Sequence, residues 1–337
     1  MTTAIGCISG GLDSTLAVAL IKRQGIEVIA FHVLHLWHPL PENPGAKPRA
    51  VATAESLGVR CVTLDAAQAD LDMVQNPKHG LGKRMNPCID CRIWSLVRAK
   101  ELMLAEGADF VFTGEVVGQR PMSQRRPTMR LIEKESGLED LLLRPLSAKS
   151  LTPTKAEREG LVDRERLMGI SGRSRREQMK LASELGITDY PSPAGGCLVT
   201  DPAFAFRLKE LLSHGPPSVA DVELLKVGRH FRLADGTLLV MGRFEKDNVL
   251  LERFLQPGDV KLEAAEIPGP TTLLRGSASE ANLATAASLT LRYIKSLPRT
   301  PWPVLVTPVG GQPRQVPAAP ADDAEARRWI ISPEEPK

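Results

Sequence analysis

The sequence has no long hydrophobic run and no strong excess of one charge. No segment reaches the ~18 to 20 consecutive apolar residues that cross a bilayer, and Met1 leads directly into an expected strand, so we expect a cytoplasmic protein. The 43 basic and 40 acidic residues leave a net charge of only +3, which by itself does not indicate a nucleic-acid partner. The chain has five cysteines, an odd number. In a reducing compartment this argues against a disulfide framework and favours thiol chemistry at a functional site.

The first 150 residues alternate between strand and helix signals. Strands are expected near residues 5–8, 25–35, 59–65, 108–113 and 141–148, with helices after the first glycine pair, at 46–58 and at 92–107, and a long loop at 66–90. This alternation is typical of βαβ units. We therefore expect an α/β domain over 1–150 with a parallel sheet and ligands at the carboxyl ends of its strands.

Two further parts follow this domain. Residues 151–215 are expected to form a helical extension that ends near the loop YPSPAGGC, and the GPPS at 215–218 is the expected boundary. Residues 218–332 predict a smaller α+β domain, with a hairpin that turns at Asp235 and Gly236. The last ~20 residues are rich in proline, alanine and acidic residues and are expected to be mobile.

The segment IGCISGGLDST at 5–15 is the most informative part of the chain, because a short strand runs through two glycines into a helix. Gly10 and Gly11 let the backbone turn tightly and approach a ligand. The first amides of the helix point free N–H groups at the same place, as in an anion site. The segment lacks the lysine and the glycine spacing of a Walker A loop and is not a dinucleotide GxGxxG.

Polar side chains surround this turn. Asp13 can hold a magnesium ion or cap the helix. Hydroxyl donors come from Ser9, Ser14 and Thr15.

Cys88 and Cys91 form a Cys-x-x-Cys that opens a helix, and Cys197 lies in the glycine-flanked PAGGC. The helix dipole and three nearby bases are expected to favour thiolates: Lys83, Arg84 and Arg92. Three thiolates can hold a [4Fe-4S] cluster and leave one iron free to carry sulfide. Alternatively, one cysteine carries a persulfide and another resolves it. A structural zinc is the third reading, and it needs a histidine from elsewhere because no second cysteine pair follows.

The other cysteines and the histidines are weaker indications of a functional site. Cys7 and Cys61 lie in apolar strands and are expected to be buried structural thiols. His32, His35 and His38 follow the second strand, where a nucleotide site or a plain loop is favoured over a metal cluster. Runs of basic residues are usually solvated helix faces, but two of them could lie near the strand ends and touch RNA: Arg120, Arg125, Arg126 and Arg130, and Arg173, Arg175, Arg176 and Lys180.

Four separated motifs, SGGLDST, NPCIDC, TGEVVGQRPMSQ and PAGGCL, resemble the PP-loop ATP pyrophosphatases related to the tRNA thiouridine synthetases, of both the 2-thiouridine and the 4-thiouridine branches, over about residues 1–213. Residues 218–332 resemble the RNA-binding domain of NFACT-type proteins. The first resemblance implies a sheet of the nucleotide α-hydrolase type. It also implies ATP held by Ser9, Gly10, Gly11, Asp13 and Ser14, and sulfur handled by Cys88, Cys91 and Cys197.

These features predict ATP-dependent thiolation of tRNA. The predicted cofactors are ATP, Mg²⁺ and a possible [4Fe-4S] cluster. The predicted sulfur donor is a cysteine desulfurase or free sulfide. A uracil oxygen would attack the α-phosphorus, and sulfur would then displace AMP. Asp13, Cys88 and Cys197 are the expected catalytic residues, and Gly114 and Gln119 are placed for the nucleotide or base. Two alternatives remain: a PP-loop enzyme that thiolates or amidates a small molecule, although no glutaminase-type domain is visible, and a non-catalytic RNA-binding adapter.

Overall fold

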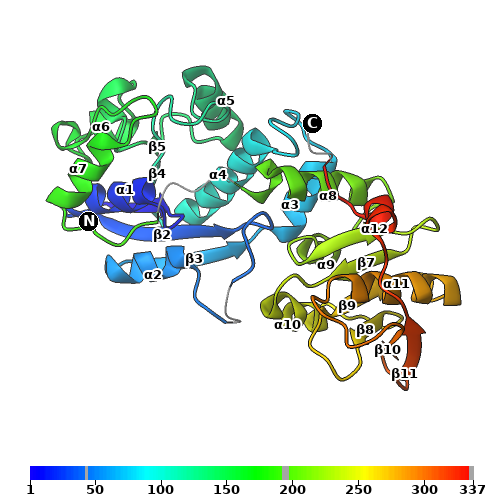
Figure 1. Cartoon of the computed structure of the whole chain (residues 1–337). Coiled ribbons are helices and arrows are strands. Elements are labelled where there is room, and N and C mark those ends of the chain that lie inside the picture. Colours follow the sequence, from blue (N-terminus) through cyan, green and yellow to red (C-terminus); the bar gives the residue numbers. More distant parts are fainter. Residues whose placement is uncertain (42–44, 192–196, 334–337) are drawn as a thin grey trace. The chain divides into compact units, whose positions relative to one another are not determined.

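The computed structural model describes residues 1–41, 45–191 and 197–333 (Figure 1). The chain divides into two compact units, Met1–Cys197 and Leu198–Lys337. Among the described residues, no helix is both long and apolar enough to cross a membrane.

The first unit contains a parallel sheet of five strands in the order β3-β2-β1-β4-β5. The strands are β1 (Thr3–Cys7), β2 (Glu27–Leu34), β3 (Arg60–Asp65), β4 (Phe110–Thr113) and β5 (Leu142–Leu143). The chain therefore builds outward from β1 to β3 and then returns to the other side of β1 for β4. Such a reversal opens a crevice at the carboxyl ends of β1 and β4, where α/β proteins bind ligands.

Helices cover both faces of this sheet. They are α1 (Leu12–Lys22), α2 (Arg49–Ser56), α3 (Ala67–Gln75), α4 (Cys88–Ala105), α5 (Arg126–Ser136), α6 (Lys155–Arg158) and α7 (Arg176–Glu184), with 3₁₀ turns at Ala148–Ser150 and Arg164–Arg166. The expectation of a continuous loop at 66–90 was wrong, because α3 lies within it. Leu71 and Val74, three residues apart, are both buried and hold this helix against the core.

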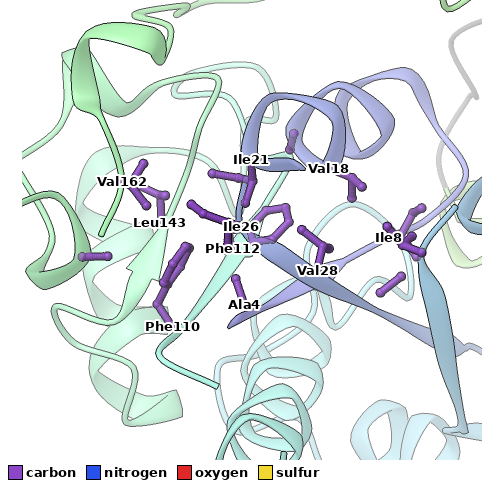
Figure 2. Close-up of a cluster of buried hydrophobic side chains, with 14 of the residues drawn as sticks. Ala4, Ile8, Val18, Ile21, Ile26, Val28, Phe110, Phe112, Leu143 and Val162 are labelled. Carbon is purple, nitrogen blue, oxygen red and sulfur yellow. The ribbon is translucent and has the colours of Figure 1, made fainter. Parts of the chain in front are cut away.

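Alternating strand residues supply a core on each face of the sheet. Ala4 of β1 packs with Val18 and Ile21 of α1 and with Phe112 of β4 (Figure 2). The next residue along β1, Ile5, faces a second cluster together with residues of α4. Burial on both faces explains why these strands read as continuous apolar runs.

The second unit contains an antiparallel sheet of six strands in the order β11-β10-β8-β9-β7-β6. The strands are β6 (Arg229–Arg232), β7 (Leu238–Met241), β8 (Val260–Ala264), β9 (Thr272–Arg275), β10 (Trp302–Pro308) and β11 (Arg314–Ala318), and the helices are α8 (Pro202–Leu212), α9 (Val219–Leu224), α10 (Glu245–Arg253), α11 (Glu280–Arg292) and α12 (Asp323–Trp329), with a 3₁₀ turn at Leu198–Thr200. β6 and β7 form the expected hairpin, in which Gly236 has a φ of +87°. The fold class is thus confirmed as a parallel α/β unit followed by an α+β unit.

Two regions differ from expectation. The division at Cys197 falls inside the segment 151–215, because α8 clusters with the second unit, where Glu210 pairs with Arg232. The chain end was expected to be mobile, but residues 318–333 include α12. Ile331 donates its backbone N–H to the His230 carbonyl at 2.8 Å, which fixes this segment to β6.

Candidate functional site

The turn after β1 has the geometry of an anion site. Gly10 adopts a φ of +73°, and a Cβ there would lie 2.9 Å from the Ala50 backbone nitrogen, so the start of α2 packs closely on this glycine. Gly11 is the N-cap of α1 and makes no side-chain cap hydrogen bond. The amides at the start of α1 therefore lie at the carboxyl end of β1, next to the end of β4.

The hydroxyl groups of this turn hydrogen-bond within it. The Ser14 hydroxyl donates to the Gly11 carbonyl at 2.9 Å, and the Thr15 hydroxyl donates to the same oxygen at 3.0 Å. The Ser9 amide donates to Ser14 Oγ at 3.2 Å, while the Ser9 side chain is exposed. Ser14 and Thr15 thus brace the turn, and the hydroxyl of the exposed Ser9 lies 3.2 Å from Ser14 Oγ.

Asp13 does not cap α1 but joins a polar network with the loop after β4. Its Oδ2 accepts a hydrogen bond from Gln119 Nε2 at 2.7 Å, and Gln119 in turn accepts one from Gln178 at 3.0 Å. Arg175 lies 3.7 Å from Asp13 Oδ1. Among the described residues, Asp13 Oδ1, Arg175 Nε and Gln178 Oε1 are buried and have no hydrogen-bond partner. Buried polar atoms of this kind indicate a place for a polar ligand or ion.

Gly114 brings the β4 loop into direct contact with α1. A Cβ at this position would lie 2.5 Å from the Asp13 backbone carbon and oxygen and from the Ser14 nitrogen. No side chain fits there. Gly114 and Gln119, which were placed at the nucleotide by their position after a strand, therefore both touch the Asp13 segment.

The three cysteines act on one another electrostatically. Cys88 is the first residue of α4, and Cys91 follows one helical turn later. Burial, followed by the Asp70 carboxylate, raises the pKa of Cys91 well above its usual value, and the charges of Cys197 and Cys88 raise it further. Burial and then Cys88 raise the pKa of Cys197. The three thiols thus lie near enough for their charges to interact, and 193–196 of PAGGC lie outside the described residues.

The expectation that nearby bases favour thiolates in the Cys-x-x-Cys was wrong for Cys91, and the pKa of Cys197 is raised as well. Arg92 does lower the pKa of both thiols, but burial outweighs it. Arg92 is half-buried and pairs with a buried carboxylate, with its Nε 3.2 Å from Glu115 Oε1. Burial raises the pKa of Glu115, but Arg92 and Arg144 outweigh that effect and hold the pKa below its ordinary value. A fixed cation therefore sits beside the thiols.

Three histidines connect the anion turn to the thiols. His32 is buried and its Nδ1 lies 2.9 Å from the Ile8 carbonyl oxygen, while burial lowers its pKa and keeps the ring neutral. The His38 ring stacks on His32 at 6.3 Å and meets the edge of His35 at 5.7 Å. His35 Nε2 lies 3.7 Å from Cys91 Sγ. A chain of contacts thus runs from the turn to the thiols.

Of the remaining candidate residues, some have a structural role and others lie at the site. Cys7 and Cys61 were expected to be buried, but both are only half-buried. Desolvation still raises the pKa of Cys7 to about 12 and also raises that of Cys61. One member of each basic run reaches the site: Arg175 lies beside Asp13, and the charge of Arg120 lowers the pKa of Cys197.

Some site residues were missed by sequence reasoning. Glu115 follows β4 directly, and this position at a strand end was an available signal. Asp70 gave no signal, because it lies in α3, within the segment predicted as a loop.

The fold is a parallel α/β unit with a glycine turn after β1, followed by a separate α+β unit. Residues 228–330 match the family described as NFACT protein RNA binding domain. The chain is 26% identical to the tRNA-specific 2-thiouridylase MnmA of Marinobacter nauticus over 68% of this chain and 58% of that protein. It is 30% identical to a probable tRNA sulfurtransferase of Aeropyrum pernix over 56% of this chain and 44% of that protein.

One solved structure is the U34-tRNA thiolase NcsA from Methanococcus maripaludis with its [4Fe-4S] cluster, at 18% identity and a TM-score of 0.31, over 66% of this chain and 70% of that one. The resemblance to tRNA thiouridine synthetases and to an NFACT-type domain is confirmed. The chain spans less than two thirds of the length of the first of these curated relatives.

Proposed function

We propose that this chain is an ATP-dependent tRNA sulfurtransferase that adenylates a uridine carbonyl and replaces its oxygen with sulfur. The observation that carries the proposal is that the turn suited to ATP and a thiol suited to sulfur transfer lie at the same edge of the first sheet. The anion turn at Ile8–Gly11 and the thiol of Cys91 are joined by the contacts of His32, His38 and His35. The curated relatives, which are named as tRNA thiolating enzymes, support the same reaction class.

The turn and the Asp13 network suit the adenylation step. Amides at the start of α1 bind the phosphates of ATP, and Asp13 Oδ1, which is buried without a hydrogen-bond partner in the described part of the chain, can hold Mg²⁺. A uracil oxygen attacks the α-phosphorus, the bond to the β-phosphate oxygen breaks, and pyrophosphate leaves. Arg175, 3.7 Å from Asp13, offsets the negative charge that develops on the phosphates.

The thiol group suits the sulfur step. Three cysteines beside the half-buried cation of Arg92 form a donor set for a soft metal or cluster. A [4Fe-4S] cluster bound by Cys88, Cys91 and Cys197 would supply a site for sulfide, and a persulfide on one cysteine is the alternative route. With sulfide, sulfur forms a bond to the activated carbon, the bond to the AMP oxygen breaks, and AMP leaves with that oxygen. With the persulfide, the outer sulfur makes the same bond and AMP leaves. A second cysteine thiolate then attacks the carrier sulfur, which breaks the S–S bond, leaves a disulfide between the two cysteines for an external thiol to reduce, and frees the thiocarbonyl.

The second unit suits an RNA partner. Its residues 228–330 match an RNA-binding family. The Arg229 guanidinium lies 4.4 Å from the centre of the Tyr293 ring, and Arg328 lies 4.4 Å from that of Trp329. Arginine and aromatic groups together bind phosphates and stack on unpaired bases. The sulfur donor is a cysteine desulfurase or free sulfide.

Pyrophosphate release with and without tRNA tests the proposal. We expect tRNA-dependent release that Asp13→Ala abolishes without unfolding the protein. Cys88→Ala and Cys197→Ala should each abolish thiolation but retain ATP binding, while Cys61→Ala, which changes a thiol outside the group, should behave as wild type. Release without RNA would instead indicate a small acceptor, and ATP binding without release would indicate an RNA-binding adapter.

A further inference from the structure

Helix α8 is fixed on strand β6 by an ion pair within the second unit. The Arg232 guanidinium donates to the two oxygens of Glu210 at 2.7 and 3.0 Å. Arg207 lies three residues before Glu210 and therefore on the same side of α8. His230 lies two residues before Arg232 and therefore on the same face of β6. This spacing brings Arg207 next to the His230 ring.

Arg243 adds a second cation at this place. It follows β7, and its Nη2 donates a hydrogen bond to the Gly228 carbonyl, just before β6 begins. Burial, followed by the charge of Arg243, lowers the pKa of Arg207 to about 10. Burial and the charges of Arg207 and Arg243 also lower the pKa of His230, to about 3. Two guanidinium groups thus lie near enough to repel each other, beside a neutral ring.

The carboxylates that lie around this arginine pair bond to the backbone instead. Asp201 acts on the charge of Arg207, but it caps α8 by accepting from the Phe204 amide at 2.8 Å. Asp247 accepts from the backbone amide of Arg243 at 3.0 Å. Arg207 Nε is buried and has no hydrogen-bond partner in the part of the chain that the structure describes. An anion bound between the two arginines would satisfy this donor and offset their repulsion.

Exposed aromatic rings accompany both arginines. Phe244 follows Arg243 directly and is 65% exposed, and Phe206 precedes Arg207 and is 42% exposed. An arginine that binds phosphate beside a ring that stacks on a base is typical of sites for unpaired nucleotides. A free phosphate ion would use the arginines and leave the rings without a role. The combination therefore favours a single-stranded nucleic acid.

We propose that Arg207 and Arg243 bind one phosphodiester of a single-stranded RNA segment, and that a neighbouring unpaired base stacks on Phe244. Because α8 precedes the residues 228–330 that match the RNA-binding family, Arg207 extends the binding surface beyond that match. The site is separate from Tyr293, because Arg229, which lies over that ring, is next to His230 in β6 and so points to the opposite face of the sheet.

The inference rests on the RNA partner of the proposed function and on none of its chemistry. Binding is measured without ATP, so the two can fail separately. A chain that binds RNA through these residues but thiolates nothing would refute only the proposed function. A chain that thiolates tRNA, and whose arginine variants bind RNA as wild type does, would refute only this inference.

The test measures binding of a short fluorescein-labelled oligouridylate to the full chain by fluorescence anisotropy over a range of KCl concentrations. Arg207→Gln and Arg243→Gln should each weaken binding about tenfold. The double variant should make the plot of log affinity against log salt less steep by about 0.7, the value for one phosphate contact on a single strand. Phe244→Ala should weaken binding about tenfold without changing this slope. Arg253→Gln, which changes an exposed arginine of α10, is the matched control and should match wild type.

Three results would overturn the inference. One is wild-type affinity in both single arginine variants. Another is an equal loss in Arg253→Gln, which would indicate a diffuse attraction to the charge of the whole unit. The third is retained RNA binding in arginine variants that lose calorimetric binding of inorganic phosphate, which would make a small anion the ligand. If circular dichroism shows that Arg207→Gln is unfolded, Arg243→Gln, which changes an exposed residue, decides the result.

Discussion

Gly114→Ala tests whether the β4 loop and the first turn of α1 form one site. The new Cβ would lie 2.5 Å from three backbone atoms, the carbon and oxygen of Asp13 and the nitrogen of Ser14. Because none of these is a side-chain atom, no rotamer change relieves the contact. Ordinary contact begins at 3.4 Å, so the start of α1 must retreat by about 0.9 Å.

That displacement moves the amides that we propose bind the phosphates of ATP. A shift of about 1 Å in a positioned site costs on the order of 100-fold in rate, and overpacking costs about 1–3 kcal/mol of stability. We expect Gly114→Ala to lose ATP affinity in calorimetric titration and to lose about 100-fold in pyrophosphate release, while circular dichroism still shows a folded chain.

Gly107→Ala is the matched control. Gly107 has a φ of +64°, and a Cβ there would meet nothing within 4 Å. The substitution therefore strains the backbone by about 1–2 kcal/mol far from the turn and should leave ATP affinity unchanged. Wild-type ATP affinity in Gly114→Ala, or an equal loss in both variants, would refute the reasoning.

Three further predictions concern buried charge, acid and RNA. Glu115→Gln removes the counter-charge of Arg92 and Arg144 and should lower the free energy of unfolding, measured by urea denaturation, by about 3–5 kcal/mol. In Glu133→Gln the side chain that changes is 24% exposed, so the loss should be less than about 1 kcal/mol. Equal losses in the two variants would contradict this prediction. Because the pKa of Glu115 is lowered in the fold, its stabilising effect is complete above the pKa of an unfolded carboxyl group and is lost as pH falls through the folded pKa. The urea midpoint of wild type should therefore fall more steeply in acid than that of Glu115→Gln, and parallel curves would argue against the effect. Tyr293→Ala should weaken RNA binding about tenfold in fluorescence anisotropy, since one stacked base contributes about 1–3 kcal/mol, and Tyr293→Phe should not; unchanged binding would exclude this ring.

The parts of the site that local sequence determines were predictable. Gly10 and Gly11 stand between a strand and a helix, and that order alone places an anion turn. The alternation of strands and helices likewise predicts a parallel sheet, which brings the end of β1 next to the end of β4.

The parts that depend on long-range packing were not predictable. Asp70 and His35 are 35 residues apart, and no local pattern marks their contact. The unit boundary shows the same limit, because GPPS at 215–218 is a strong turn signal. The packing of α8 through Glu210 and Arg232 sets the division at Cys197 instead. Burial also reversed the expected direction of the thiol pKa shifts, and burial cannot be read from neighbouring residues.

Cys197 is the last residue of the first unit, and Leu198 is the first residue of the second. One peptide bond thus links a site thiol to the body that matches an RNA-binding family. A protease cut at the junction would make Cys197 a chain terminus, so isolating the two bodies would alter the very centre that such an experiment aims to study.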